Sequence, residues 1–354
     1  MGALGLFVAV CTPSAESVSA VATVRVPASA NHRCVVPASG RPAVAWSHLR
    51  NPILSYPTAG AKDQALIWAG GTWHLLFSYL TNDVPTPGGE HWSIATATSR
   101  DLTRWSAPSV WPDQPGTLGV VSPDIVRSPS GVYVATYESN PGEVGGLPDK
   151  TYYRTSSDLE RWSAPHELAR SLHPAPGDRM IDPSLAWTAH GLIVGYKLGE
   201  DVQHFEIGWS PSGSLDGPWV FVGRPDITVY GDTVENLEFL TVHGAWRLVA
   251  TSNTLDQPWI FSLVGNPAQP SSWLHWDHGR ELQIPSQAWN TGRGISSVGF
   301  EHANSVFVCD ATAQDGYYYA TYAGSDELTH FGGWGHAKIG IARSTDLLHW
   351  QVPG

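Results

Sequence analysis

Short apolar runs recur along most of the chain, and turn residues separate them. Five stretches share one plan, in which a polar or acidic start leads into an apolar run, a turn and a second apolar run. They read KDQALIWAGGTWHLLFSY, SPDIVRSPSGVYVATYES, MIDPSLAWTAHGLIVGYK, VENLEFLTVHGAWRLVATS and EHANSVFVCDATAQDGYYYATY. Such runs between Gly and Pro predict short strands, and no long amphipathic helix pattern accompanies them.

The spacing of these stretches predicts the architecture. Their leading polar residues are separated by 61, 58, 53 and 67 positions, and they are Asp63, Asp124, Asp182, Glu235 and His302. Units of similar length, each with room for about four short strands, are typical of a β-propeller. The sequence therefore predicts an all-β chain that folds as a five-bladed β-propeller.

A second motif returns after the strands. It reads TSRDLTRWSAP, TSSDLERWSAP and RSTDLLHWQVP, with looser forms in SLDGPWVF and QPSSWLHW. Ser, Thr and Asp side chains cap tight turns through their oxygens. We expect the aspartates to be structural, and the Leu and Trp residues to pack between neighbouring blades. We also expect the segment AVAWSHLR to supply a closing strand that joins the two ends of the chain.

The N-terminal residues predict export. Residues 1–20 resemble a secretory signal peptide, residues 21–44 are an extension, and residues 45–354 form the propeller domain. Cys34 and Cys309 remain after the leader, and they either pair or stay as buried thiols. The net charge of −12 and the absence of a basic run argue against binding to nucleic acid or to an anionic membrane. We expect a secreted monomer.

The first strand of each blade lines the central channel of a propeller, so the leading residues should converge on the axis. Buried carboxylates are costly unless they are paired, hydrogen-bonded or used in chemistry. Hydrolysis of a glycosidic bond uses such a set, with one carboxylate to activate water and one carboxylic acid to protonate the leaving oxygen. A further carboxylate can raise the pKa of that acid. The pattern therefore indicates a glycosidase that needs no organic cofactor.

These motifs resemble those of glycoside hydrolase families 43 and 62, which include five-bladed arabinanases, xylosidases and α-L-arabinofuranosidases. The resemblance runs from about residue 45 to the end of the chain. AKDQALIWAGGTWHLLFS implies Asp63 as the general base, although Gln64 replaces the usual Pro. MIDPSLAW implies Asp182 as the pKa modulator. VENLEFLTVHG implies Glu235 as the general acid, although Asn236-Leu237 replaces Gly-Pro.

The resemblance also implies residues that contact the sugar. Glu238 is the alternative acid, and strand alternation would turn it to the opposite face from Glu235. SPDIV places Asp124 as a structural or substrate-facing residue, and NTGRGISS places Arg293 against sugar hydroxyls. GFEHANSVF implies His302 as a ligand, or as a water anchor, for an axial Ca²⁺. Aromatic side chains stack on sugars, and the candidates for this role are Trp68, Trp187 and Trp289.

The sequence thus predicts an exported, inverting glycoside hydrolase that acts on an arabinose- or xylose-containing oligosaccharide or polysaccharide of plants. Two alternatives stay open. The first is a carbohydrate-binding propeller without catalysis, which the replacements at Gln64 and at Asn236-Leu237 favour. The second is a related propeller glycosidase with another sugar specificity, because loop lengths and a few hydroxyl contacts decide which sugar binds.

Overall fold

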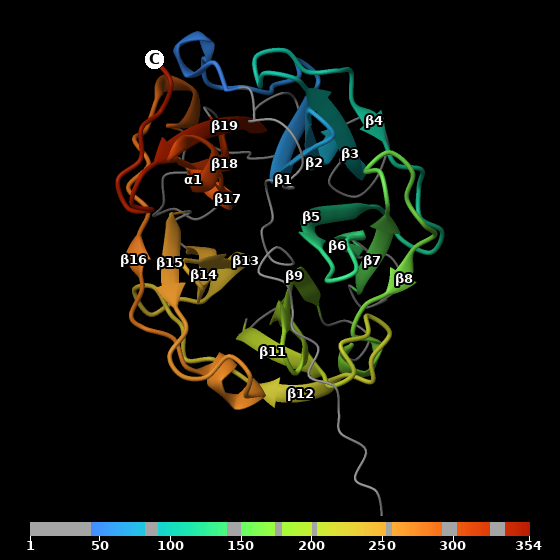
Figure 1. The fold of residues 1–354 in the computed structure, drawn as a ribbon. Coiled ribbons are helices and arrows are strands. Elements are labelled where there is room, and N and C mark those ends of the chain that lie inside the picture. Colours follow the sequence, from blue (N-terminus) through green and yellow to red (C-terminus); the bar gives the residue numbers. More distant parts are fainter. Residues whose placement is uncertain are drawn as a thin grey trace, which may run out of the picture.

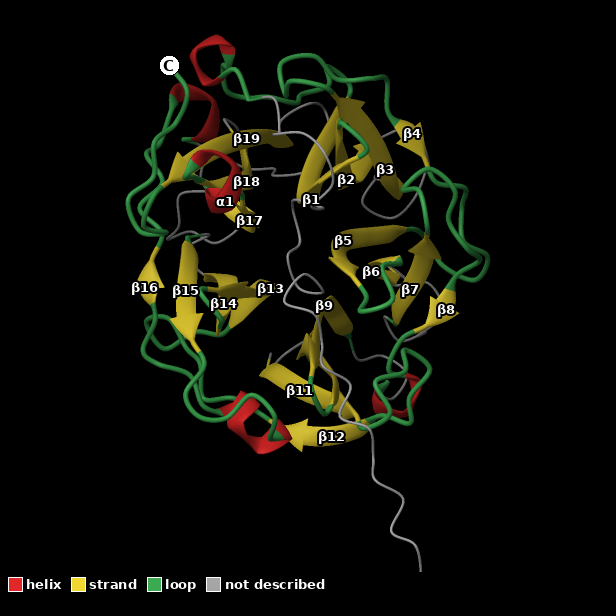
Figure 2. Ribbon diagram, in the orientation of Figure 1, coloured by secondary structure: helices red, strands yellow, loops and turns green. Residues whose placement is uncertain are grey.

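The computed structural model describes residues 44–81, 91–139, 150–173, 179–199, 204–252, 257–291, 303–325 and 337–354. Five antiparallel sheets stand around a common axis, as Figures 1 and 2 show. The predicted five-bladed β-propeller is confirmed. None of the helices within these residues is long and apolar enough to cross a membrane.

Each sheet runs from an inner strand at the axis to an outer strand at the rim (Figure 1). The first blade contains β1 (Ala59–Ala69), β2 (Thr72–Thr81), β3 (His91–Ser99) and β4 (Ser109–Val110). The second contains β5 (Val120–Arg127), β6 (Tyr133–Ser139), β7 (Thr151–Ser156) and β8 (His166–Glu167). The third contains β9 (Met180–Thr188), β10 (Gly191–Leu198), β11 (His204–Ser210) and β12 (Val220–Gly223).

The last two blades complete the ring. The fourth contains β13 (Val234–Val242), β14 (Ala245–Ser252), β15 (Pro258–Ser262) and β16 (Arg280–Glu281). The fifth contains β17 (Asn304–Asp310), β18 (Tyr318–Ser325) and β19 (Ala337–Ser344). Short helices lie in the connections, and they are η2 (Trp46–His48), η3 (Arg170–Leu172), η4 (Pro270–Leu274), η5 (Ala288–Asn290) and α1 (Thr312–Asp315).

The hydrophobic core is divided among the spaces between neighbouring blades. One cluster joins blades three and four, where Phe205 and Phe239 pack with the fully buried Trp273. Another joins blades two and three through Tyr153, Leu185 and their neighbours. Each blade therefore buries both faces of its sheet, which explains why the strands read as nearly continuous apolar runs.

The recurring turn has the predicted structural role. In the second blade it follows β7, where the Asp158 carboxylate accepts the backbone N–H groups of Glu160 and Arg161 at 3.0 and 2.8 Å. Leu159 adopts a left-handed backbone conformation and is buried, whereas Trp162 is only partly buried. In this turn the leucine is more completely buried than the tryptophan, which packs against Trp111.

The ring closes near the N-terminal end of the described residues, but not through the predicted strand. Residues 44–50 contain helix η2 instead. The backbone of Ile53 and Leu54 pairs with Ile339 of β19, with N–H···O distances of 2.8 Å from Ile53 and 3.0 Å from Ile339. Chain ends are thus joined as expected, by residues that follow AVAWSHLR.

Every inner strand carries one bulge at the same level of the ring. At each bulge the pairing with the second strand shifts register. A non-glycine residue there has a φ between 48° and 53°, and these residues are Asp63, Ser122, Asp182, Asn236 and Ser305. Left-handed backbone at such residues is uncommon and gathers at functional sites. The bulges define a ring of five equivalent positions around the axis.

Candidate active site

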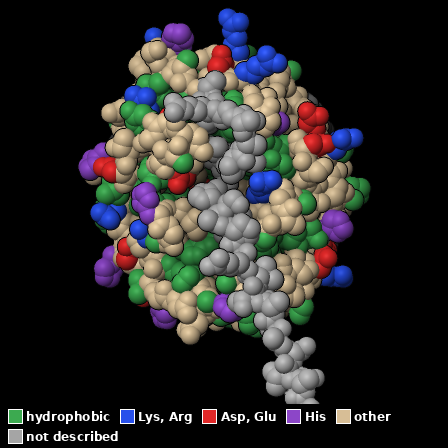
Figure 3. Space-filling view, viewed as in Figure 1, with side chains coloured by type: hydrophobic (Ala, Val, Ile, Leu, Met, Phe, Trp, Pro, Cys, Tyr) green, Lys and Arg blue, Asp and Glu red, His purple; other side chains and the backbone are tan. Residues whose placement is uncertain are grey.

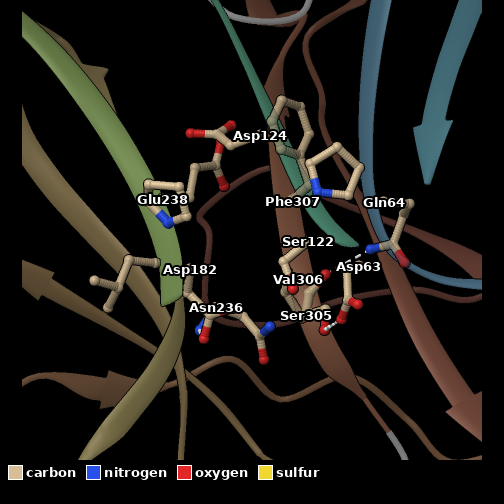
Figure 4. Close-up of a pocket in the computed structure, with 13 residues that line it drawn as sticks. Asp63, Gln64, Ser122, Asp124, Asp182, Asn236, Glu238, Ser305, Val306 and Phe307 are labelled. Carbon is tan, nitrogen blue, oxygen red and sulfur yellow. Dashed lines mark hydrogen bonds between the residues drawn. The ribbon is translucent and has the colours of Figure 1, made fainter. Parts of the chain in front are cut away.

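A small cavity lies on the axis, inside the ring of bulges, and both polar and apolar side chains line it. Its volume of about 40 Å³ has room for a few water molecules, not for a sugar ring. Figure 4 shows its walls, which come from the inner strands of all five blades. The lining residues include Asp63, Gln64, Ser122, Asp124, Asp182, Asn236, Glu238 and Ser305. A sugar that reaches these groups must therefore lie at the mouth of the cavity.

Asp63 is held rigidly at its bulge in β1. The hydroxyl of Ser305 donates to its Oδ1 at 2.7 Å, and the hydroxyl of Ser78 donates to its Oδ2 at 2.8 Å. The Lys62 ammonium lies 3.5 Å from Oδ1. Gln64, which replaces the expected proline, donates to the backbone oxygen of Ser305 and ties blade one to blade five. These contacts orient a buried carboxylate toward the axis.

Asp182 occupies the equivalent bulge in β9 and is also buried. Burial and, next, the nearby Glu235 carboxylate raise the pKa of Asp182 above its ordinary value. Lys197 and the Asn236 N–H, which donates to Asp182 Oδ2 at 3.0 Å, oppose this rise in pKa, and Asp63 adds to it. The three predicted acids thus share one electrostatic environment, although they come from three different blades.

Glu235 lies at the start of β13, where its side chain is 20% exposed. Its Oε2 is 2.6 Å from the ammonium of Lys197 on β10, whose side chain is only 3% exposed. The sequence reading missed Lys197. A single lysine inside the apolar run GLIVGYKL was the signal that could have found it, because a lysine is almost never fully buried without a partner.

Asp124 and Glu238 lie in the axial cavity, where they link blades. Asp124 Oδ2 accepts the Ser184 hydroxyl of blade three at 2.9 Å, and its Oδ1 accepts the Ile125 N–H at 2.7 Å. Glu238 Oε2 accepts the N–H of Val308 in blade five at 2.7 Å. Glu235, by contrast, is not among the residues that line the cavity. The two glutamates therefore have different surroundings, although the bulge at Asn236 interrupts the strand alternation between them.

The assumption that the leading residues share one register is wrong in three blades. The residues at the level of Asp63 and Asp182 are Ser122, Asn236 and Ser305. Asp124 follows this level by two positions, Glu235 precedes it by one, and His302 precedes Ser305 by three. Every blade has the bulge at the same level, so the misalignment came from taking the first acidic or polar residue of each motif, which stands at a different distance from the bulge in each of these blades.

The aromatic candidates serve the core instead of the cavity. Asp182 is near the start of β9, whereas Trp187 is near its end and packs between blades two and three. Trp68 meets Trp73 edge to face, and Trp289 stacks on Tyr322. All three are at most 9% exposed and none lines the cavity, so they pack in the core, and their role in sugar stacking stays a prediction.

Three predicted features lie outside the described residues, namely Arg293, His302 and Cys34. Within the described residues, no group of three or more His, Cys, Asp or Glu side chains has the arrangement of a metal site. The expected axial Ca²⁺ therefore stays a prediction. Cys309 is disulfide-bonded, and its partner is not among the described residues.

Charged side chains near the axis contrast with the outer surface. On the face shown in Figure 3, basic, acidic and histidine side chains are dispersed among apolar and uncharged ones. At the axis, the described carboxyl groups of Asp63, Asp124, Asp182 and Glu238 gather around one cavity.

Comparison with known proteins identifies the fold. No protein-family model matches the sequence, and no curated protein matches it either. Solved structures do match. A glycosyl hydrolase from Bacteroides ovatus is 14% identical with a TM-score of 0.58, and the match covers 90% of this chain and 97% of that one.

Two further structures extend the comparison. An α-L-arabinofuranosidase from Lactobacillus brevis is 12% identical with a TM-score of 0.54, covering 85% of this chain and 94% of that one. A family 130 structure, from work on hydrolases that target β-1,2 mannosidic linkages in Candida mannan, is 12% identical with a TM-score of 0.56. That match covers 89% of this chain and 97% of the other. The chain thus has the fold of the five-bladed propeller glycoside hydrolases.

Proposed function

We propose that the protein is a glycoside hydrolase, and that its substrate is an arabinose- or xylose-containing glycan of plants. The observation that carries this proposal is the convergence of Asp63 and Asp182, from blades one and three, on one axial cavity, with Glu235 of blade four near enough to raise the pKa of Asp182. Two of them sit at left-handed bulges, a strained geometry that gathers at functional sites. Carboxyl groups placed around one linkage are the machinery of glycoside hydrolysis.

The proposed reaction inverts the configuration at the anomeric carbon. Asp63, held by two serine hydroxyls, takes a proton from a water molecule that attacks the sugar. The leaving oxygen receives a proton from the pair formed by Asp182 and Glu235. Within that pair, the resemblance to families 43 and 62 assigns the donor to Glu235 and the modulator to Asp182. The small axial cavity supports attack by water from beneath a sugar bound at the mouth.

Export is part of the proposal. The signal-like N-terminus and the disulfide bond of Cys309 support it, because cytosolic thiols are mostly kept reduced.

Hydrolysis assays test the proposed function. Purified protein is incubated with p-nitrophenyl α-L-arabinofuranoside, p-nitrophenyl β-D-xyloside, arabinan and arabinoxylan, together with mannoside and fructoside controls. We expect turnover of at least one pentoside, and Asp63→Ala should lower kcat by about 10²–10⁴-fold. Asp113→Ala is the matched control, because the Asp113 side chain is 83% exposed, and it should leave the rate unchanged.

Two outcomes would contradict the proposal in different ways. Binding of arabinan or xylan without turnover would favour a carbohydrate-binding propeller. Turnover of mannosides or fructosides alone would show that the protein is a glycoside hydrolase, but that its substrate is not an arabinose- or xylose-containing glycan. Proton NMR of the first-formed product reports the anomer, and a product with retained configuration would exclude the inverting reaction.

A further inference from the structure

Tyr230 is the most exposed of the large hydrophobic side chains that the structure describes, at 78%. It lies in the connection from β12 at the rim to β13 at the axis (Figure 1), five residues before Glu235. Ile227 and Val229 of this connection are buried between blades three and four, whereas Thr228 and Tyr230 are exposed. The connection is thus anchored in the core and holds the Tyr230 ring outside it.

Tyr230 and Gly231 form the tip of a two-residue hairpin. Val229 and Asp232 exchange both of their backbone hydrogen bonds, with N···O distances of 2.9 and 3.1 Å. The φ values of Tyr230 and Gly231 are 52° and 84°, and a hairpin turn with two positive φ values favours Asn or Gly at its first position. A bulky residue is disfavoured there, and burial does little to offset the cost because most of the ring is exposed. Backbone strain of this kind gathers at functional sites.

The hairpin stands on the open side of the axial site. The residues that line the cavity lie at the bulges or directly after them, and in blade four they run from Asn236 to Glu238. Glu235 comes before its bulge, and its side chain is 20% exposed. Residues that precede the bulge therefore lead to the mouth. Five extended residues span at most about 18 Å, so Tyr230 lies within that distance of Glu235 along the chain.

The strand pairing of blade four shows where the ring lies relative to the axis. Glu235 pairs with Thr251, and Thr251 pairs with Pro258, so these residues form one row across the blade. Neighbouring strands are about 4.8 Å apart, which puts Pro258 about 10 Å outward from Glu235. Trp259 follows Pro258, and its ring meets the Tyr230 ring edge to face, with 5.8 Å between the centroids. Tyr230 is therefore supported over blade four, outward from the carboxyls by the length of a few sugar units.

We propose that Tyr230, supported by Trp259, is the aromatic platform of a distal sugar-binding subsite. The substrate is then an oligosaccharide or polysaccharide that runs from the axial carboxyls outward over blade four. This inference rests on the proposed hydrolase function, and it names a residue that selects substrates by chain length. A sugar ring has a face of C–H groups that packs on an aromatic ring, and the tyrosine hydroxyl can donate to or accept from its hydroxyls. The exposed Tyr230 ring gains burial when a sugar covers it.

Kinetics on substrates of increasing length test the platform. Wild type and Tyr230→Ala are assayed on arabino-oligosaccharides and xylo-oligosaccharides, from the disaccharides to the hexasaccharides. We expect kcat/KM of wild type to rise with length until the chain reaches Tyr230. Tyr230→Ala should lose about 10-fold in kcat/KM on the longest substrate, mainly through KM, because an aromatic contact is lost only where a sugar covers the ring. On the disaccharide it should match wild type. Equal losses at every length, or no loss at any length, would overturn the proposal.

A substitution that suits the turn separates binding from folding. Asn is favoured at the first position of this turn, so Tyr230→Asn should unfold at the same urea concentration as wild type or at a higher one. It should nevertheless lose the same affinity as Tyr230→Ala, whereas Tyr230→Trp should keep most of it. Phe221→Ala is the matched control, because Phe221 is an aromatic residue on the outer strand β12 that is 49% exposed, and it should leave the affinity unchanged. Full affinity in Tyr230→Asn would show that the ring does not bind the sugar.

Binding measurements without turnover distinguish this inference from the hydrolase proposal. Calorimetry measures the binding of arabinohexaose and xylohexaose to Asp63→Ala and to the double variant Asp63→Ala/Tyr230→Ala. Binding of one hexasaccharide that is about 10-fold weaker in the double variant supports the platform. The same result with no hydrolysis of any glycoside by wild type would reject the hydrolase function alone. Hydrolysis by wild type with equal binding by the two variants, or with no hexasaccharide binding by Asp63→Ala, would reject the platform alone.

Discussion

Asp182 and Glu235 are neighbouring carboxyls that their contacts make different. Asp182 is buried at a strained bulge and receives one backbone N–H, whereas Glu235 is more exposed and touches an ammonium. Burial and the Glu235 charge raise the pKa of Asp182. Two acids in unequal surroundings can divide the roles of proton donor and charge stabiliser, which identical surroundings would not allow.

The raised pKa of Asp182 has a consequence for stability. A carboxyl whose pKa is higher in the folded than in the unfolded protein binds more protons when folded. Its contribution to the free energy of unfolding is therefore complete below the unfolded pKa of about 3.9, and it is lost as pH rises through the folded pKa. Each unit of difference corresponds to about 1.4 kcal/mol.

We therefore expect Asp182→Asn to become more stable relative to wild type as pH rises. The amide cannot ionise, and its oxygen can still accept the Asn236 N–H. Urea unfolding at about pH 4 and at about pH 8 measures the difference between the two proteins in free energy of unfolding, which should be larger in favour of the variant at the higher pH. Asp226→Asn, at an exposed site, should show no such trend. A constant difference between the two pH values would show that the folded protein does not raise the pKa of Asp182.

Sequence reasoning recovered the carboxyls but not their partners. Asp63 and Asp182 stand in motifs that can be recognised locally. Lys197 lies in blade three, and its partner Glu235 lies in blade four, 38 positions further along the chain. No local pattern encodes that contact, since it exists only once the ring has formed.

At the level of the strand, the bulge is the element that shapes the site. It turns Asp63 and Asp182 toward the axis and directs backbone N–H groups to the preceding blade. The repeat spacing predicted five blades with four strands in most of them. It did not predict the bulges, because an extra residue in a strand leaves no mark on a pattern of apolar letters. The positions of Asp124 and Glu235 relative to the bulge were misread because the first acidic residue of each motif was taken as the marker.

Asn236 tests the bulge itself. Its φ of 49° suits Gly and disfavours β-branched residues. Asn236→Gly keeps the N–H that Asp182 accepts, so it should fold with a free energy of unfolding within about 1 kcal/mol of wild type. Asn236→Val should lose about 1–3 kcal/mol from backbone strain and lower the hydrolysis rate by displacing Asp182. Denaturant unfolding and kcat measure both effects. Equal stability of the two variants would contradict the importance of the left-handed conformation.

At the scale of the whole molecule, the site requires a closed ring. Asp63 of blade one takes a hydrogen bond from Ser305 of blade five, so the first and last blades must meet for the cavity to form. The pairing of residues 53–54 with β19 joins these blades. Sequence reasoning anticipated that the chain ends meet. It placed the contact a few residues too early, because the apolar AVAWSHLR resembles a strand although η2 lies within it.

Asn51 is the polar centre of this closure. Its Nδ2, which has two hydrogens to donate, lies 2.9–3.0 Å from Gln287 Oε1, the Tyr322 hydroxyl and the Ile341 carbonyl oxygen, and its Oδ1 accepts the Ile341 N–H at 2.9 Å. Asn51→Ala leaves several of these groups without a partner, and each costs about 1–3 kcal/mol when buried.

We expect Asn51→Ala to lower the free energy of unfolding by about 2–4 kcal/mol in a denaturant titration, because closure depends on this side chain. The folded fraction should keep its hydrolytic rate at low temperature, since Asn51 does not line the cavity. Asn266→Ala, which removes one hydrogen bond in an exposed turn, is the control and should cost about 0.5 kcal/mol or less. If the two variants unfold at the same denaturant concentration, ring closure does not depend on Asn51, and the apolar pairing of Ile53 and Leu54 with β19 suffices to hold the first and last blades together.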